Sequence, residues 1–255
     1  MFLNWLGSLP GAAAQGMIWG IMAVGLYITF KILDIADLTV DGSICTGAAT
    51  CAVLITSGLP IWLAMLCAFI AGMLAGLVTG LFHTFMGITP ILAGILTQLI
   101  LWSVNLKIMG KANIALPIKK YDLIVSISSS FSSILVLLLF IAAIVGVLYW
   151  FFGTELGTSM RATGNNLNMS RAQGINTNLM KVLGLVLSNG IVALSGALLA
   201  QYNGLCRSAP GAPLRQQGVL LPGPPLRQQV NRVSADRVQS ASPPTDPGLY
   251  RTPTL

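Results

Sequence analysis

Residues 134–152 read ILVLLLFIAAIVGVLYWFF and contain no charged side chain. A helix rises about 1.5 Å per residue, so a run of this length can cross roughly 30 Å of hydrocarbon. The run lies inside a longer segment, 123–154, that carries no Asp, Glu, Lys or Arg. We therefore predict a membrane-spanning helix here, and its closing aromatic residues are typical of the headgroup level.

Three other segments also lack these charged residues: 1–30, 42–106 and 182–206. Only 8% of the 255 residues are charged, against about 25% in an ordinary soluble domain. This excludes a soluble enzyme or binding module as the whole protein. The predicted fold is an all-α membrane protein, a polytopic transmembrane helical bundle of about six spans, with spans at 11–30, 44–58, 61–82, 88–106, 134–152 and 182–202.

The first two of these spans are atypical. No Lys or Arg precedes the first, which therefore lacks the charged start of a signal peptide and is expected to be a retained anchor. The second is short and rich in small residues. After a polar loop over 31–43, it is expected to be a broken or re-entrant segment, which is tolerated only where protein or a water-filled cavity surrounds it.

The composition changes abruptly near Gly204. Residues 1–204 carry eight basic side chains, six of them Lys, whereas residues 205–255 carry six Arg, no Lys and nine of the 13 prolines. The tail also contains Pro-Leu-Arg-Gln-Gln twice, so it is expected to be disordered. Two origins stay open: a natural basic tail near an anionic membrane face, or a chain that leaves its reading frame near Gly204. The abruptness favours the second.

Small residues recur every four positions in two of the predicted spans. The third span has Gly72, Gly76 and Gly80, and the sixth has Gly196 and Ala200 followed by Gly204. This spacing lines up small residues on one helix face, where another backbone can approach closely. We interpret both series as helix packing and not as chemistry.

Residues 153–181 form a long segment between two predicted spans, and loops of that length usually have a function. The Gly-Asn-Asn run at 164–166 is a helix-stop signal, so 167–173 is expected to be a short helix closed by Gly174. A small helical element at the membrane face would fit a groove of a soluble partner. The plain alternative is a connector.

Three blocks of sequence resemble a known family. Arg161-Ala162-Thr163-Gly164-Asn165, followed by Arg171-Ala172-Gln173-Gly174-Ile175-Asn176, resembles the cytoplasmic coupling segment of ATP-binding cassette (ABC) importer permeases of the branched-chain amino acid and ribose type. The blocks IADLTVDGS at 35–43 and NLKIMGKANI at 105–114 are similar to that family too. The resemblance covers about residues 11–204, and the family continues with several more spans.

The resemblance implies that two permease subunits form a pathway. A separate ATPase docks on the coupling segment and switches the permease from outward- to inward-facing. This places 153–181 in the cytoplasm, which loop charges alone leave undecided. The implied ATPase-coupling residues are Glu155, Gly157, Arg161, Ala162, Gly164, Asn165, Arg171, Ala172, Gly174 and Ile175. Arg161 would contact the ATPase or hold the coupling helix, and the glycines at 164 and 174 would set its turns.

A second set of residues is assigned to the translocation pathway on the same resemblance and on polarity within the spans. It consists of Asp37, Thr39, Asp41, Gly42, Ser43, Gln98 and Asn189. The acids would lie at the entrance of the second span. For them, a solvated loop with ordinary helix caps is an equal alternative.

The expected partners are an ABC ATPase, a second permease copy, an extracytoplasmic solute-binding protein and membrane lipid, with the chain in the cell membrane and an amino acid or related solute as cargo. No cofactor, metal, nucleic acid or enzymatic activity is predicted. His83 is the single His, Gly110-Lys111-Ala112 does not complete a P-loop, and the four cysteines show no C-x-x-C spacing. Two alternatives are a non-transporting fragment of such a permease, inactive or an assembly partner only, and an intramembrane enzyme, for which the spans lack paired catalytic groups.

Overall fold

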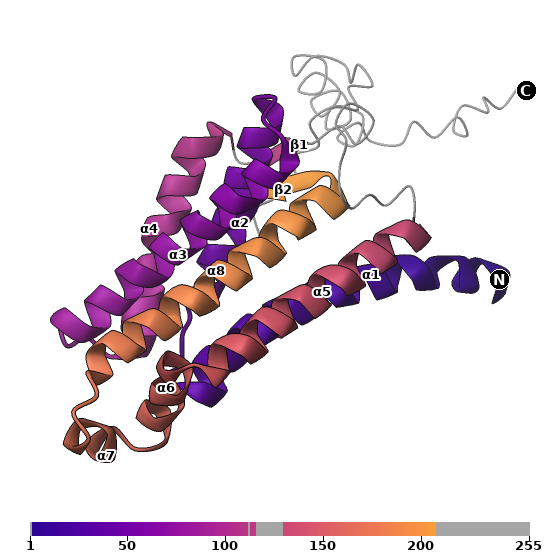
Figure 1. Cartoon of the computed structure of the whole chain (residues 1–255). Coiled ribbons are helices and arrows are strands. Elements are labelled where there is room, and N and C mark those ends of the chain that lie inside the picture. The colour runs from indigo at the N-terminus through magenta and orange to yellow at the C-terminus, as the bar shows by residue number, and fades with distance from the viewer. Residues whose placement is uncertain (1, 112, 116–129, 208–255) are drawn as a thin grey trace, which may run out of the picture. The chain divides into compact units, whose positions relative to one another are not determined.

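The computed structural model describes residues 2–111, 113–115 and 130–207. These residues belong to one compact unit, Met1–Leu214, and nearly all regular structure in them is helical (Figure 1). The elements in chain order are α1 (Phe2–Tyr27), η1 (Ile28–Ile32, a π-helical turn), α2 (Val40–Thr56), α3 (Ile61–Phe85), α4 (Pro90–Met109), β1 (Asn113–Ala115), α5 (Ser130–Gly153), α6 (Glu155–Asn165), α7 (Leu167–Ala172), α8 (Thr177–Asn203) and β2 (Leu205–Arg207).

Five helical segments of the described chain are long and apolar enough to cross a membrane, which confirms the predicted class. They are Leu9–Ile32, Ile61–Phe85, Pro90–Met109, Ile134–Gly153 and Thr177–Asn203. Each contains or closely matches one of the predicted spans. The remaining prediction, 44–58, corresponds to the shorter apolar helix α2.

Helix α2 differs from the sequence prediction in two ways. It is one uninterrupted helix of 17 residues, so the segment is not broken, and the re-entrant alternative stays a prediction. It also begins at Val40, so Asp41, Gly42 and Ser43 lie in its first turn and not in a loop. The backbone N–H of Ser43 donates to the carbonyl of Thr39 at 2.9 Å, and the Asp41 carboxylate lies at the helix end where a negative charge is favourable.

Helix α8 is the centre of the described bundle. Helices α2 and α3 pack along it and against each other, and α1 also packs on α8 (Figure 1). Helix α4 contacts α2 and α3, whereas α5 contacts α1 and α6. In its most apolar window, 67% of α8 is buried but only 11% of α5, so these two helices have very different surroundings.

The close packing of α3 on α8 depends on small residues. A Cβ atom added to Gly76 would collide with the backbone of Leu185, and Gly72 and Gly80 face the same helix. Gly47 of α2 likewise lies against the backbone of Ala193 in α8. Without a hydrophobic force between helices in lipid, such backbone approach is a main source of association.

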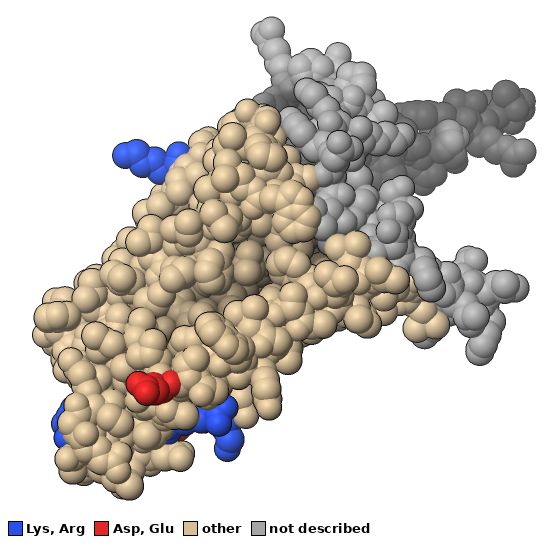
Figure 2. Space-filling view, viewed as in Figure 1, with Lys and Arg blue, Asp and Glu red and all other residues tan. Residues whose placement is uncertain are grey.

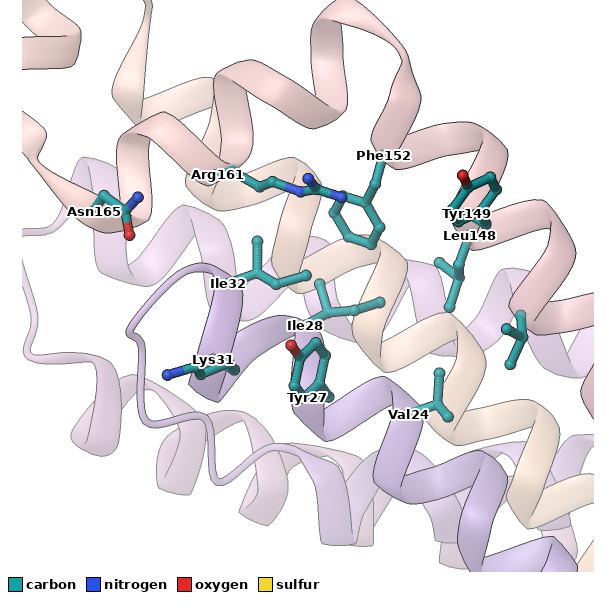
Figure 3. A pocket seen from close by; sticks show the side chains of 11 residues that line it. Val24, Tyr27, Ile28, Lys31, Ile32, Leu148, Tyr149, Phe152, Arg161 and Asn165 are labelled. Atoms are coloured by element: carbon teal, nitrogen blue, oxygen red, sulfur yellow. The ribbon is translucent and has the colours of Figure 1, made fainter.

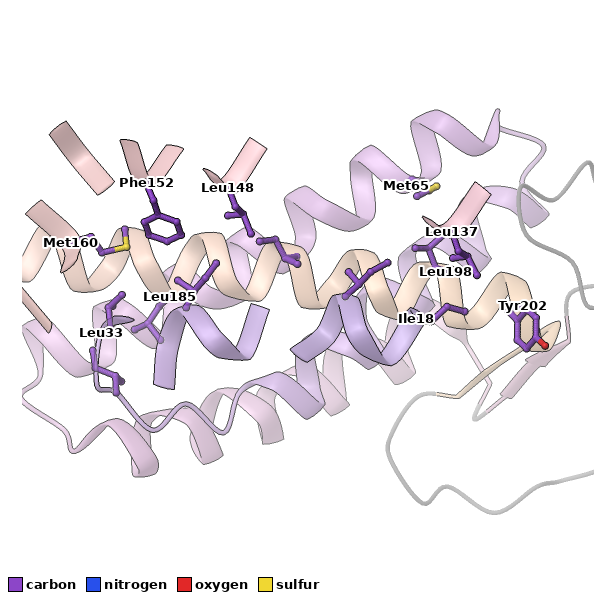
Figure 4. Close-up of a cluster of buried hydrophobic side chains, with 14 of the residues drawn as sticks. Ile18, Leu33, Met65, Leu137, Leu148, Phe152, Met160, Leu185, Leu198 and Tyr202 are labelled. Atoms are coloured by element: carbon purple, nitrogen blue, oxygen red, sulfur yellow. The ribbon is translucent and has the colours of Figure 1, made fainter. Parts of the chain in front are cut away.

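Larger side chains fill the space between α1, α5 and α8. One buried cluster follows α8 and contains residues from all three helices and from α6 (Figure 4). Its members include Ile18, Leu137, Leu198 and Tyr202 towards one end of α8, and Phe152, Met160 and Leu185 towards the other. The Tyr202 hydroxyl donates to the Gly11 carbonyl at 2.9 Å, which satisfies its polar end inside this apolar layer.

The two short strands close the bundle at the end of α8. They pair antiparallel, with Asn113 opposite Arg207 and Ala115 opposite Leu205. Strand β2 thus begins just beyond the composition change near Gly204, which ends α8 in the left-handed conformation. The rest of the predicted tail, 208–255, lies outside the described residues.

Candidate functional site

Two short helices project from the end of the bundle between α5 and α8. Thr154 caps α6: its hydroxyl accepts from the Gly157 N–H at 3.5 Å and donates to the Phe151 carbonyl at 2.6 Å. Asn166 ends α6 and begins α7, and its Oδ1 accepts from the N–H groups of Asn168 and Met169, both at 3.1 Å. The helix expected over 167–173 is therefore present, because an Asn cap satisfies its first free donors.

The inner face of α6 anchors this element to the bundle. Met160 and Thr163 are buried, and Met160 belongs to the apolar cluster along α8. Gly164 lies inside α6 and not in a turn. It packs so closely that a Cβ on it would collide with the Ile32 carbonyl oxygen. This corrects the turn-setting role expected for Gly164. Gly174 does adopt the left-handed conformation, with φ of 81°, after α7.

The outer face of the element is exposed and mixed in character. Leu167 and Met169 are apolar yet 38% and 59% exposed, and the exposed Arg171 lies on the same short helix. Neither Leu167 nor Met169 was in the predicted coupling set. The exposed members of that set are Glu155, Arg161, Asn165, Arg171, Ala172 and Gly174, whereas Gly157 is buried and Ala162, Gly164 and Ile175 are half-buried. Six of the ten predicted coupling residues are therefore exposed, and their role in coupling stays a prediction.

Arg171 is fixed by a contact within this element. Its Nε donates to the Thr177 hydroxyl at 3.1 Å, which joins the end of α7 to the first turn of α8. Asn176 caps α8 by accepting from the Leu179 N–H at 3.3 Å. The chain leaving α7 is thus held at both sides of the turn that Gly174 makes.

Arg161 points back to the bundle. Its guanidinium lies 5.3 Å from the centre of the Phe152 ring (Figure 3). Phe152 in turn meets the Phe151 ring edge-on. Arg161 also lines a cavity of about 630 Å³ between α1, α5 and α6. The other lining residues are Val24, Tyr27, Ile28, Lys31, Ile32, Val145, Leu148, Tyr149, Phe152 and Asn165. Sequence patterns did not single out this cavity, because its walls come from three separate segments.

A buried polar network joins α2, α3 and α8 next to the segment that follows η1. The Asp37 carboxylate accepts from the Thr39 N–H at 2.8 Å and from the Asn189 side-chain amide at 2.7 Å. Ser43 donates to the Asn189 Oδ1 at 2.6 Å, and the hydroxyls of Thr39 and Thr79 lie 2.8 Å apart. All five side chains are at most 2% exposed, so each polar atom depends on these partners.

The network includes four of the seven predicted pathway residues and omits three. Asp41 is exposed, on the opposite side of the first turn of α2. Gly42 packs on α4, where a Cβ would come within 3.2 Å of the Gln98 Cα, and the Gln98 side chain is half-buried. Thr79 was missed by sequence reasoning, although a hydroxyl next to the packing residue Gly80 was an available signal.

The charged side chains and the thiols of the described residues do not indicate a further site. On the face shown in Figure 2, charged side chains gather near the ends of the helices and leave the middle bare, as a membrane-spanning bundle requires. In the described part of the chain, no group of three His, Cys, Asp or Glu side chains is placed to hold a metal ion. Burial raises the pKa of the Cys206 thiol in β2 to about 12, so this thiol stays protonated and unreactive at neutral pH.

Several known proteins match this chain. The tyrosine transport system permease protein of Clostridioides difficile is 42% identical over 190 residues, which cover 74% of this chain and 63% of that protein. The uncharacterized protein RP368 of Rickettsia prowazekii is 36% identical over 76% of this chain and 68% of its own length. The autoinducer 2 import system permease protein LsrC of Yersinia pestis is 26% identical over 82% of this chain and 58% of its own length.

The chain thus spans about three fifths of the length of the tyrosine and autoinducer 2 relatives. No solved structure matches it. The family described as branched-chain amino acid transport system, permease component, matches residues 8–214, which is most of the chain and extends past residue 204. The resemblance to ABC importer permeases is therefore confirmed, and the chain belongs to the family of permease components of branched-chain amino acid transport systems.

Proposed function

We propose that this chain is the membrane subunit of an ATP-driven importer in the cell membrane and that α6 and α7 dock on its separate ATPase. The observation that carries the proposal is the two-sided character of this element. Its inner face is fixed in the apolar cluster through Met160, while Met169 and Leu167 are exposed beside polar side chains. Exposed apolar side chains on a short helix at the end of a bundle are suited to a groove of a soluble partner.

The proposal gives Arg161 a holding role and not a contact with the ATPase. Its guanidinium stacks on Phe152 of α5 and so ties α6 to the preceding spanning helix. A force applied to α7 would then reach the bundle as movement of α6, since α6 is fixed on both sides. Of the two roles open for Arg161, the geometry favours holding the coupling helix.

A short series of contacts leads from α6 to the polar network. Gly164 packs on the backbone of Ile32 and Leu33, and the Leu33 side chain packs on Gly184 of α8. The segment continues directly to Asp37, which is bonded to Asn189. We assign the network the role of holding α2 and α8 together beside the pathway, so that both follow a movement of α6.

The proposed solute is an amino acid or a related compound. The relative named as a tyrosine transport permease supports this, and it makes tyrosine the first compound to test. A binding protein outside the membrane would deliver the solute, and a second copy of the chain would complete the pathway, as in the family that the sequence resembles. Uptake of labelled tyrosine separates an active permease from a non-transporting fragment.

Docking can be tested by co-purification with a co-expressed importer ATPase. We expect Met169→Asp to lower ATPase recovery at least tenfold, because a carboxylate replaces an apolar contact at the centre of α7. Met86→Asp is the matched control. Met86 ends α3 at the same end of the bundle and is 65% exposed, against 59% for Met169.

The two outcomes are clearly separated. Normal expression of both variants with ATPase lost only from Met169→Asp supports the proposal. Equal ATPase recovery from Met169→Asp and the unchanged chain would overturn it. A cysteine at exposed Asn166 adds a test of orientation: labelling by an impermeant reagent from outside intact cells would also overturn the cytoplasmic placement.

A further inference from the structure

The cavity between α1, α5 and α6 has an apolar wall and a cationic end. Val24 and Ile28 of the first span and Leu148 of α5 form the wall (Figure 3). Val145 of α5 also lines it. Lys31 and Arg161 lie where the wall ends, together with the Asn165 amide. A volume of about 630 Å³ lies in the range of sites that hold small organic ligands.

No acidic side chain among the described residues pairs with the two cations of the cavity. None of the residues that line it is an Asp or Glu. Among the described residues, neither Lys31 nor Arg161 forms an ion pair, and the contact of Arg161 is with the face of the Phe152 ring. The cationic end of the cavity is therefore complementary to an anion.

The depth of this end in the membrane follows from its aromatic neighbours. Tyr27 and Tyr149 line the cavity and are 59% and 85% exposed, and Trp150 beside the latter is 72% exposed. Exposed Tyr and Trp at the end of a span mark the level of the lipid headgroups. Lys31 follows Tyr27 by one helical turn, so its ammonium lies at phosphate depth or just outside it.

We infer that this cavity binds an anionic phospholipid, with the phosphate between Lys31 and Arg161 and an acyl chain along the wall formed by α1 and α5. The cavity has its cations at headgroup depth and its apolar wall towards the membrane centre. A phospholipid has its anionic and apolar parts in the same order. The site does not involve the exposed face of α7, so it stands apart from the proposed docking of an ATPase. It would give the α5–α6 corner a lipid-dependent stability.

The test uses the purified full chain in detergent and native mass spectrometry with phosphatidylglycerol and phosphatidylcholine of the same acyl chains. We expect roughly tenfold tighter binding of phosphatidylglycerol, because both lipids carry a phosphate but only phosphatidylglycerol has a net negative charge, which each of the two basic side chains favours severalfold. The double variant Lys31→Gln/Arg161→Gln should bind both lipids alike. Lys107→Gln/Lys111→Gln, which removes two exposed cations beside the other end of the bundle, is the matched control and should keep the preference.

A second variant tests the apolar half of the site with both cations intact. Val145 is 47% exposed and lines the cavity, so Val145→Trp should fill the space without disturbing the buried core and should remove the bound lipid. Equal binding of the two lipids by the unchanged chain would overturn the proposal. An unchanged preference for phosphatidylglycerol in the Lys31→Gln/Arg161→Gln variant would overturn it as well. The same result in the Val145→Trp variant would also overturn it, because the lipid would then be attracted by charge and not held in the cavity.

Discussion

The helices α3 and α5 are both long apolar spans, yet they are built into the bundle by opposite means. Helix α3 approaches α8 through glycines with backbone against backbone, whereas α5 meets α1 and α6 through large side chains such as Phe152. A Cβ on Gly76 of α3 would collide with α8, but one on Gly146 of α5 would meet nothing within 4 Å. Apolarity therefore places both helices in the membrane. Only the position of α3 against its neighbour is determined by close shape complementarity.

The largest change in stability is expected when each of these two glycines is replaced separately by Leu. We predict that Gly76→Leu lowers the free energy of unfolding by about 3 kcal/mol, since the added side chain has to displace the α8 backbone. Gly146→Leu should leave it unchanged or slightly raised, because Leu favours a helix over Gly. Reversible unfolding in mixed micelles measures both variants. Similar losses at the two positions would show that the contrast between α3 and α5 is not real.

The polar network gives a second test of the same comparison, because it joins α2, α3 and α8 and does not reach α5. Asn189→Leu removes the amide that bonds both Asp37 and Ser43, and we expect a loss of about 2 kcal/mol, within the range for hydrogen bonds to charged groups. Asp41→Ala, at an exposed acid four residues after Asp37, should change stability by about 0.5 kcal/mol or less. If both variants unfold at the same denaturant concentration, the network does not stabilise the bundle.

The smallest effect is expected on the α5 side. Phe152 and Arg161 interact through the ring face, and a double-mutant cycle with Phe152→Leu and Arg161→Gln should give a coupling free energy of about 1 kcal/mol. Amide hydrogen exchange over α6 should rise in both single variants, because the cation fixes α6 to α5. Additive effects of the two substitutions would show that the stacking has no energetic consequence.

Much of this fold could be predicted from where charges are missing. Gaps without Asp, Glu, Lys or Arg predicted all five spanning helices, and the Gly-Asn-Asn run at 164–166 predicted the end of one short helix and the start of the next. These features are local, since they depend on hydrocarbon thickness and on capping by a neighbouring side chain.

Features that depend on distant residues could not be predicted in the same way. Asp37 was recognised as a polar residue of interest, but its bond to Asn189 joins positions 152 residues apart. Gly164 was expected in a turn because Gly and Asn are adjacent there, whereas its actual constraint is the backbone of Ile32 from another segment. The start of α2 was placed too late because Asp41, Gly42 and Ser43 look like a loop until the bond of Ser43 to Asn189 of α8 is known.

The bond between Asp37 and Asn189 has a consequence for how the protein is made. A ribosome adds about 5–20 residues per second, so Asn189 follows Asp37 by roughly 8–30 s. During that interval the early helices are already synthesised, but the carboxylate lacks the amide that it bonds in the finished bundle. Biosynthesis must therefore shelter a nascent negative charge, by water, by the insertion machinery or by delayed entry of α2 into the bilayer, until the last described helix arrives.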